Sequence, residues 1–166
     1  MGSRSLEWRR RLRAAFAPAF VALACCAAAG CSARSPAYPP GYTQRRSAAG
    51  TFWVRTLPGG GRETYRVQTR PFTGSLKDLA SSETIDTVLR NKGARYVSSD
   101  PFPGCPGEAG ILTFHISGAT GSEIREEAFT VFNQQSIVVT ATRPATQPLE
   151  RAVRSAMGEN VCNVPL

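Results

Sequence analysis

The sequence predicts an α+β domain in which helices flank an antiparallel β-sheet. Three β-rich segments with turn residues between them, residues 111–117, 124–132 and 136–142, favour an antiparallel meander. Two further alternating segments surround a glycine run and predict a hairpin. Apolar residues at helical spacing over residues 149–157 predict a closing amphipathic helix.

The first thirty residues have the composition of an export signal. Residues 1–13 carry five arginines against one acid, Glu7, and residues 14–30 are uncharged and mostly alanine. A basic stretch, a short apolar run and small residues are typical of a signal peptide. The apolar run is 17 residues long, at the short edge of what crosses a bilayer, so a permanent membrane helix is the alternative.

The formal net charge of +8 is concentrated at the N-terminus. Residues 1–30 contribute +4, residues 31–50 contribute +3, and residues 51–166 contribute only +1. Because the predicted domain is almost neutral, the basic composition does not indicate a nucleic-acid partner.

The stretch Ala28-Ala29-Gly30-Cys31-Ser32 resembles a bacterial lipobox, with alanine where leucine is usual. In that family the cysteine sulfur receives a diacylglycerol, a lipoprotein signal peptidase cuts before the cysteine, and the new amino terminus is often acylated. The resemblance implies lipid attachment at Cys31 and a domain outside the cytoplasm, at the cell membrane or outer membrane. A plain secretory signal ending in the same alanines is the alternative.

Residues 31–50 are rich in proline, glycine, serine and arginine and show no apolar period, so we expect a flexible tether. Within it, residues 38–42 are a candidate first short strand. Residues 51–166 then form one domain. It opens with strands at residues 51–57 and 62–70, joined by the glycine turn.

The first helix is predicted over residues 75–91, with Ser75 and Asp78 at its start and Gly93 as its stop. Its apolar residues fall on two nearly opposite faces. The helix therefore either restarts near Ser81 or is covered on two sides. The two sets are Leu76, Leu79 and Ala80, and Ile85, Val88 and Leu89.

A short strand at residues 94–99 and a loop at residues 101–110 precede the meander. For the closing helix, Thr146 is the expected cap and Gly158 the expected stop. Two cysteines remain in the exported domain, Cys105 and Cys162, and an even pair there predicts a disulfide.

The order of these elements resembles the PsbP-like family. The resemblance is carried by Pro39-Pro40-Gly41-Tyr42 at the entry, Ser75-Leu76-Lys77-Asp78-Leu79 at a helix start, the paired strands of residues 127–142 and the final helix. It implies an antiparallel sheet flanked by helices that serves in assembly or binding, usually without catalysis.

The residues suggest no catalytic centre. His115 is the only histidine, no Gly-x-Ser-x-Gly motif is present, and the ligands for a metal are lacking, so we expect no enzyme, cofactor or metal. Arg66 and Arg70 share a strand face and suit an anionic ligand, which makes them, with His115, a candidate ligand site. The acidic residues Glu123, Glu126 and Glu127 are expected at a solvated rim.

These observations predict a non-catalytic, membrane-anchored lipoprotein that binds or scaffolds a protein partner in the cell envelope. A carrier of a small anionic or apolar ligand is the alternative, and a hydrolase is a third.

Overall fold

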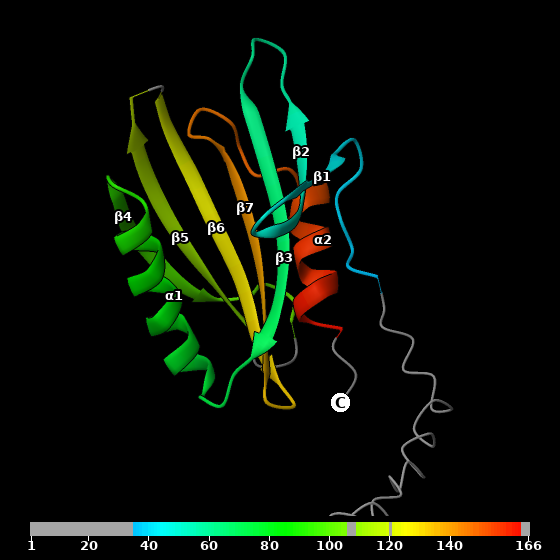
Figure 1. Cartoon of the computed structure of the whole chain (residues 1–166), viewed down its shortest axis with the longest axis vertical. Coiled ribbons are helices and arrows are strands. Elements are labelled where there is room, and N and C mark those ends of the chain that lie inside the picture. Colours follow the sequence, from blue (N-terminus) through cyan, green and yellow to red (C-terminus); the bar gives the residue numbers. More distant parts are fainter. Residues whose placement is uncertain (1–34, 106–108, 120, 164–166) are drawn as a thin grey trace, which may run out of the picture. The chain divides into compact units, whose positions relative to one another are not determined.

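The computed structural model describes residues 35–105, 109–119 and 121–163, so Cys31 and the predicted signal peptide lie outside it. The described chain forms an antiparallel sheet with two helices, which confirms the α+β prediction (Figure 1). In chain order the elements are β1 (Thr43–Ser47), β2 (Gly50–Thr56), β3 (Arg62–Pro71), α1 (Leu76–Arg90), β4 (Ala94–Pro101), β5 (Ala109–Gly118), β6 (Gly121–Phe132), β7 (Gln135–Pro144) and α2 (Arg151–Val161).

The sheet has the strand order β1-β2-β3-β7-β6-β5-β4. The predicted hairpin is present as β2 and β3, and the predicted meander as β5, β6 and β7. Pairing of β3 with β7 joins the two units, with Tyr65 opposite Ala141. Within the described chain, β1 and β4 are the two edges of the sheet.

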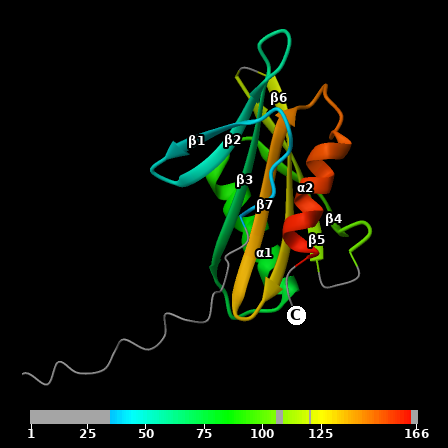
Figure 2. The same ribbon diagram turned by 90° about the vertical axis from the view of Figure 1, so that its right-hand side faces the viewer.

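The two faces of the sheet pack against different helices, because side chains alternate between faces along each strand. On one face, Tyr65 and Val139 pack with Met157 of α2. On the other face, Leu112 and Phe114 pack with Leu79 of α1. Figure 2 shows the hairpin of β1 and β2 projecting from the sheet on the side away from α2. The hairpin and α1 therefore border the same sheet face.

Helix α1 begins as the sequence predicts. The Ser75 hydroxyl accepts a hydrogen bond from the Asp78 amide, and the Asp78 carboxylate accepts one from the Ser75 amide, which forms a capping box. The helix is continuous to Arg90, so it does not restart near Ser81. Gly93 follows with φ +83°, and a Cβ there would lie 2.4 Å from the Ser117 carbonyl oxygen.

Helix α2 differs from its predicted bounds. Its N-cap is Glu150 rather than Thr146, and it continues through Gly158 to Val161. A Cβ at Gly158 would lie 3.2 Å from the Phe102 ring, so this glycine allows close packing inside the helix instead of ending it. Cys162 caps the helix and forms the predicted disulfide with Cys105.

The predicted flexible tether is wrong for residues 37–50. The Asn160 side chain accepts a hydrogen bond from the Ala37 amide and donates one to the Ala37 carbonyl. Pro39 is fully buried, and residues 43–47 form strand β1 rather than a linker. Residues 38–42 are not a strand. Proline and arginine made this segment look like a linker, but here the proline packs against the domain.

Among the described residues, no helix is both long enough and apolar enough to cross a membrane.

Candidate functional site

The structure separates the residues of the predicted ligand site. Arg66 is the register partner of Thr140, and Thr140 is the register partner of Glu127. Register partners lie on the same face of a sheet, and Glu127 lies on the α1 face, so Arg66 lies on that face too. His115 is the register partner of Ile124. Ile124 is two residues from Glu126, which is opposite Ala141 on the α2 face, so His115 lies on the α2 face as well. A single site containing both Arg66 and His115 is therefore excluded by the register.

The two arginines of the predicted site also differ in their partners. Arg70 forms an ion pair with Glu83 of α1, whose carboxylate is buried, so the Arg70 charge is neutralised within the domain. Arg66 lies over the Phe52 ring, with its guanidinium carbon 5.8 Å from the ring centroid. No ion pair of Arg66 occurs among the described residues.

Arg66 lines a solvent-open groove of about 270 Å³ on the α1 face of the sheet, which we call the arginine groove. Its floor is formed by side chains of β3, β7 and β6, and Phe52 of β2 forms one wall. None of its lining residues is acidic. The lining consists of Phe52, Thr64, Arg66, Gln68, Arg125, Thr140 and Thr142.

The second arginine of this groove is held by a buried carboxylate. Arg125 donates from Nε to Oε1 of Glu127 over 2.6 Å, and Thr87 of α1 donates to the same oxygen over 2.9 Å. Glu127 is fully buried, and its Oε2 has no hydrogen-bond partner in the described chain. Because Nε of Arg125 is occupied, its two Nη groups are the donors left for the groove.

The acidic residues expected at a solvated rim are in fact largely buried. Glu126 is 7% exposed and pairs with Arg143 at 2.9 Å, while Glu127 is 0% exposed and pairs with Arg125. Adjacent residues of a strand point to opposite faces, so these two carboxylates cannot act as a pair. Only Glu123 of the three is exposed, which leaves a solvated rim of one residue.

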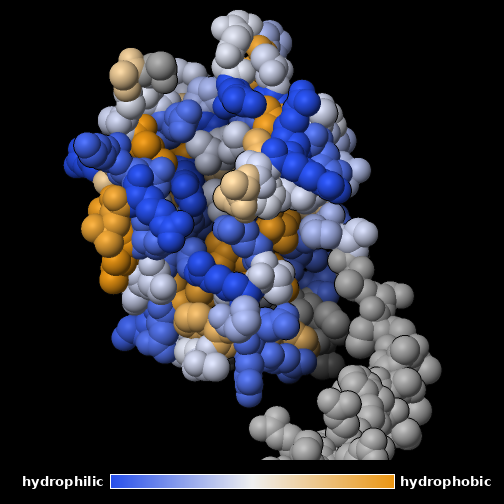
Figure 3. Space-filling model, viewed as in Figure 1, coloured by the Kyte–Doolittle hydropathy of each residue, from blue (hydrophilic) through white to orange (hydrophobic). Residues whose placement is uncertain are grey.

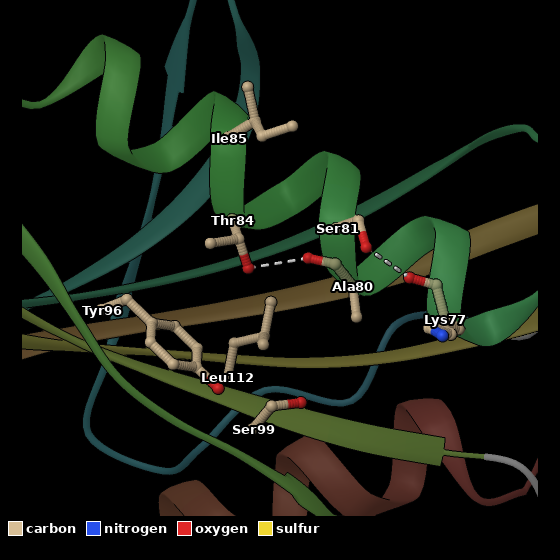
Figure 4. A pocket seen from close by; sticks show the side chains of 8 residues that line it. All are labelled: Lys77, Ala80, Ser81, Thr84, Ile85, Tyr96, Ser99 and Leu112. Carbon is tan, nitrogen blue, oxygen red and sulfur yellow. Dashed lines mark hydrogen bonds between the residues drawn. The ribbon is translucent and has the colours of Figure 1, made fainter.

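A second surface lies where α1 crosses the edge strand β4. Two adjoining hollows of about 420 and 610 Å³ run between the helix and the strand and share Lys77, Ala80 and Ser99 in their lining. Figure 4 shows the first hollow, with residues of α1 facing Tyr96 and Leu112 of the sheet.

The polar residues of α1 in this hollow are satisfied within the helix. Ser81 donates its hydroxyl hydrogen to the Lys77 carbonyl, and Thr84 donates to the Ala80 carbonyl (Figure 4). Their methylene and methyl groups therefore contribute to an apolar lining.

Large apolar side chains are exposed beside these hollows. Figure 3 shows a hydrophobic patch over α1, at the left of the view. We call the patch and the hollows together the α1–β4 surface. Two of its exposed apolar residues, Ile85 and Tyr96, line the first hollow. The other exposed large apolar residues of α1 and β4 are Val88, Leu89 and Val97, and Leu89 is the most exposed of them, at 77%. These residues include the second apolar set of the helix, which the described chain leaves uncovered.

An ionic cluster around the buried carboxylate of Glu63 lies on the α2 face and has a structural role. Arg55 donates from Nε to Glu63 over 2.8 Å and also contacts Glu150 just before α2. The hydrogen bond from Arg55 holds the pKa of Glu150 below its usual value. Burial raises the pKa of Tyr42, and its hydrogen bond to Glu63 raises that pKa further. The cluster ties the N-terminal segment and α2 to strands β2 and β3.

Among the described residues, no three His, Cys, Asp or Glu side chains gather closely enough to hold a metal ion.

Comparison with known proteins leaves the family open. No family model matches the sequence. No curated protein matches it either. A solved structure with a similar arrangement is that of CalU16 from Micromonospora echinospora, which is 12% identical and matches over 63% of this chain and 70% of that chain, with a TM-score of 0.32. At that TM-score the likeness carries no argument about this protein.

Sequence reasoning identified Arg66 but missed Arg125. The two arginines are 59 positions apart in the sequence and meet only because β3 pairs with β7 and β7 with β6. The signal available in the sequence was the alternation of β6, which puts Arg125 and Glu127 on one face.

Proposed function

We propose that this protein is an exported lipoprotein, cut before Cys31 and anchored by lipid at that cysteine, whose domain binds or scaffolds a protein partner outside the cytoplasm. The lipobox resemblance supports the anchor. The disulfide between Cys105 and Cys162 supports export, because disulfides persist in oxidising compartments.

The observation that carries partner binding is the α1–β4 surface. Exposed apolar patches of this kind mark interaction sites on soluble domains, because leaving such side chains in water is unfavourable. Leu89 and Val97 are both more than half exposed, although other apolar residues of the domain are well buried. Strand β4, which carries Val97, is also an edge of the sheet among the described residues.

The ordered N-terminal segment supports a position close to the bilayer. Ala37 is fixed to α2, and only six peptide units separate it from Cys31. Even a fully extended chain of that length spans only about 20 Å. A lipid on Cys31 would therefore hold the domain next to the membrane, where its partner would be a membrane or envelope protein.

The same proposal includes a PsbP-like, non-catalytic domain. The order of hairpin, helix, strand, meander and closing helix agrees with the expectation from that family. A non-catalytic role is part of this proposal, and the register partners of His115 are Arg95 and Ile124.

Site-specific photo-crosslinking in intact cells tests partner binding. A photoreactive residue at Leu89 or at Val97 should give the same discrete adduct, whereas one at Arg154, exposed on α2, should not. A Leu89→Glu variant should lose the partner when the protein is recovered from detergent-solubilised membranes. Equal labelling at all three positions, or no adduct at any, would contradict partner binding through the α1–β4 surface.

A further inference from the structure

Beyond partner binding, we propose that the arginine groove is a binding site for a small oxyanion ligand carrying phosphate or carboxylate groups. Arg66 and Arg125 are its principal donors. This site lies on the same sheet face as α1 but shares no lining residue with the hollows of the α1–β4 surface. The two roles can therefore be tested separately.

The register places the two arginines on either side of β7. Arg66 is opposite Thr140 on one side, and Arg125 is opposite Thr142 on the other. Strands β3 and β6 are two strand spacings apart, roughly 10 Å, which the long arginine side chains can span from both sides. A small anion above the threonines would thus meet two guanidinium groups and two hydroxyls.

Each arginine is oriented before a ligand arrives. Arg66 rests on the Phe52 ring, an arrangement that leaves the edge of a guanidinium group available for a carboxylate or phosphate. Arg125 is held through Nε by the buried Glu127, so its Nη groups remain available. Prior orientation lowers the entropy lost on binding.

The charge and size of the groove define the ligand class. Arg66 has no acidic partner among the described residues, and no carboxylate lines the groove. Arg45 adds a further cation on the same face, because its register partner is Phe52. The groove volume of about 270 Å³ is below the range of roughly 300–1,000 Å³ typical for drug-sized ligands, which indicates a small ligand.

Isothermal titration of the full chain in detergent with inorganic pyrophosphate, and separately with citrate, tests this site. We expect saturable binding of at least one probe, weakened about tenfold or more in Arg66→Gln. Arg66→Lys keeps the charge but loses the planar guanidinium group, so its affinity should lie between those of the wild type and Arg66→Gln. Arg154→Gln makes the same charge change on exposed α2 and should bind like the wild type. An unchanged thermal midpoint shows that Arg66→Gln is folded.

Lipid vesicles distinguish two sources of the bound phosphate group, a lipid headgroup and a free ligand. The Cys31→Ser chain, which lacks the lipid site, is mixed with phosphatidylglycerol vesicles and with phosphatidylcholine vesicles. Binding to the anionic vesicles alone, displaced by pyrophosphate and weakened by Arg66→Gln, assigns the groove to a lipid headgroup. Pyrophosphate or citrate binding without vesicle binding assigns it to a free ligand. If neither probe nor vesicle binds, or if Arg66→Gln and Arg154→Gln lose affinity equally, the site does not exist.

Discussion

The side chain of Asn160 forms hydrogen bonds with both backbone groups of Ala37, over 3.1 Å to the amide and 2.8 Å to the carbonyl. The same side chain also contacts the Tyr65 hydroxyl over 3.1 Å. One residue near the end of the chain thus fixes the N-terminal segment to α2 and to the sheet. This contact places the start of the domain within a few residues of the proposed lipid.

Replacing Asn160 tests this attachment. Asn160→Ala should lower the free energy of unfolding by about 1–3 kcal/mol, because it leaves partly buried backbone groups without partners. Urea denaturation measures the loss, and limited proteolysis should cut near Ala37 earlier than in the wild type. Asn163→Ala is the control at an exposed position just past α2 and should change neither property. Equal effects of the two variants would show that the contact does not hold the segment.

The same substitution should have a large effect on stability at the buried face of α1 and almost none at the exposed face. Leu79 is fully buried against Leu112 and Phe114, whereas Leu89 is 77% exposed. Leu79→Ala should destabilise the domain by about 2–5 kcal/mol through lost contacts and a cavity. Leu89→Ala should stay within about 0.5 kcal/mol. A large loss from Leu89→Ala in the isolated protein would mean that this residue is buried, and that the α1–β4 surface is not free.

The disulfide should contribute a large share of the stability. It links positions 57 residues apart, and closing a loop of that size stabilises by about 4 kcal/mol on the chain-entropy estimate. Urea denaturation of Cys105→Ser/Cys162→Ser, compared with the oxidised wild type, measures the effect. Reducing agent should bring the wild type to the stability of the variant and leave the variant unchanged. A variant as stable as the oxidised protein would contradict this.

Alkaline pH should destabilise the domain through Tyr65. Burial raises the pKa of Tyr65 above its usual value, so the folded state favours the protonated phenol. The stabilisation is complete below the unfolded pKa of about 10 and is lost as the pH rises above it. As the pH rises above about 10, the thermal midpoint should fall less steeply in Tyr65→Phe than in the wild type. Tyr96→Phe, at a half-exposed position, should keep the wild-type slope.

The local elements could be predicted from the sequence because their signals are local. The capping box of Ser75 and Asp78 and the alternation of β5 to β7 lie within short windows. Strand β1 was missed because its residues, including Arg45 and Arg46, are all exposed and show no apolar alternation. The pairing that holds it is with β2, and a tether-like composition does not reveal such pairing.

The candidate sites were harder to predict because they depend on strand order and register. The side chains of Arg66 and His115 lie on opposite faces only because β7 pairs with β3 and β6 with β5. Glu127 looked solvated beside Glu126, but the Thr87 hydroxyl and Arg125 hold it beneath α1. Thr87 is distant from Glu127 in the sequence. Arg125 is close to it, but that contact can be predicted only when it is known which face of the strand is buried.

The anchor at Cys31 is the claim on which the cellular role depends, and intact mass measurement of the protein extracted from membranes tests it most directly. The mass should equal that of the polypeptide from Cys31 to Leu166 plus a diacylglyceryl group, with any further acyl chain on the new amino terminus. A Cys31→Ser chain should lack the lipid mass and leave the membrane fraction or remain uncut. A wild-type mass that includes Met1 and an unmodified Cys31 thiol would contradict the account.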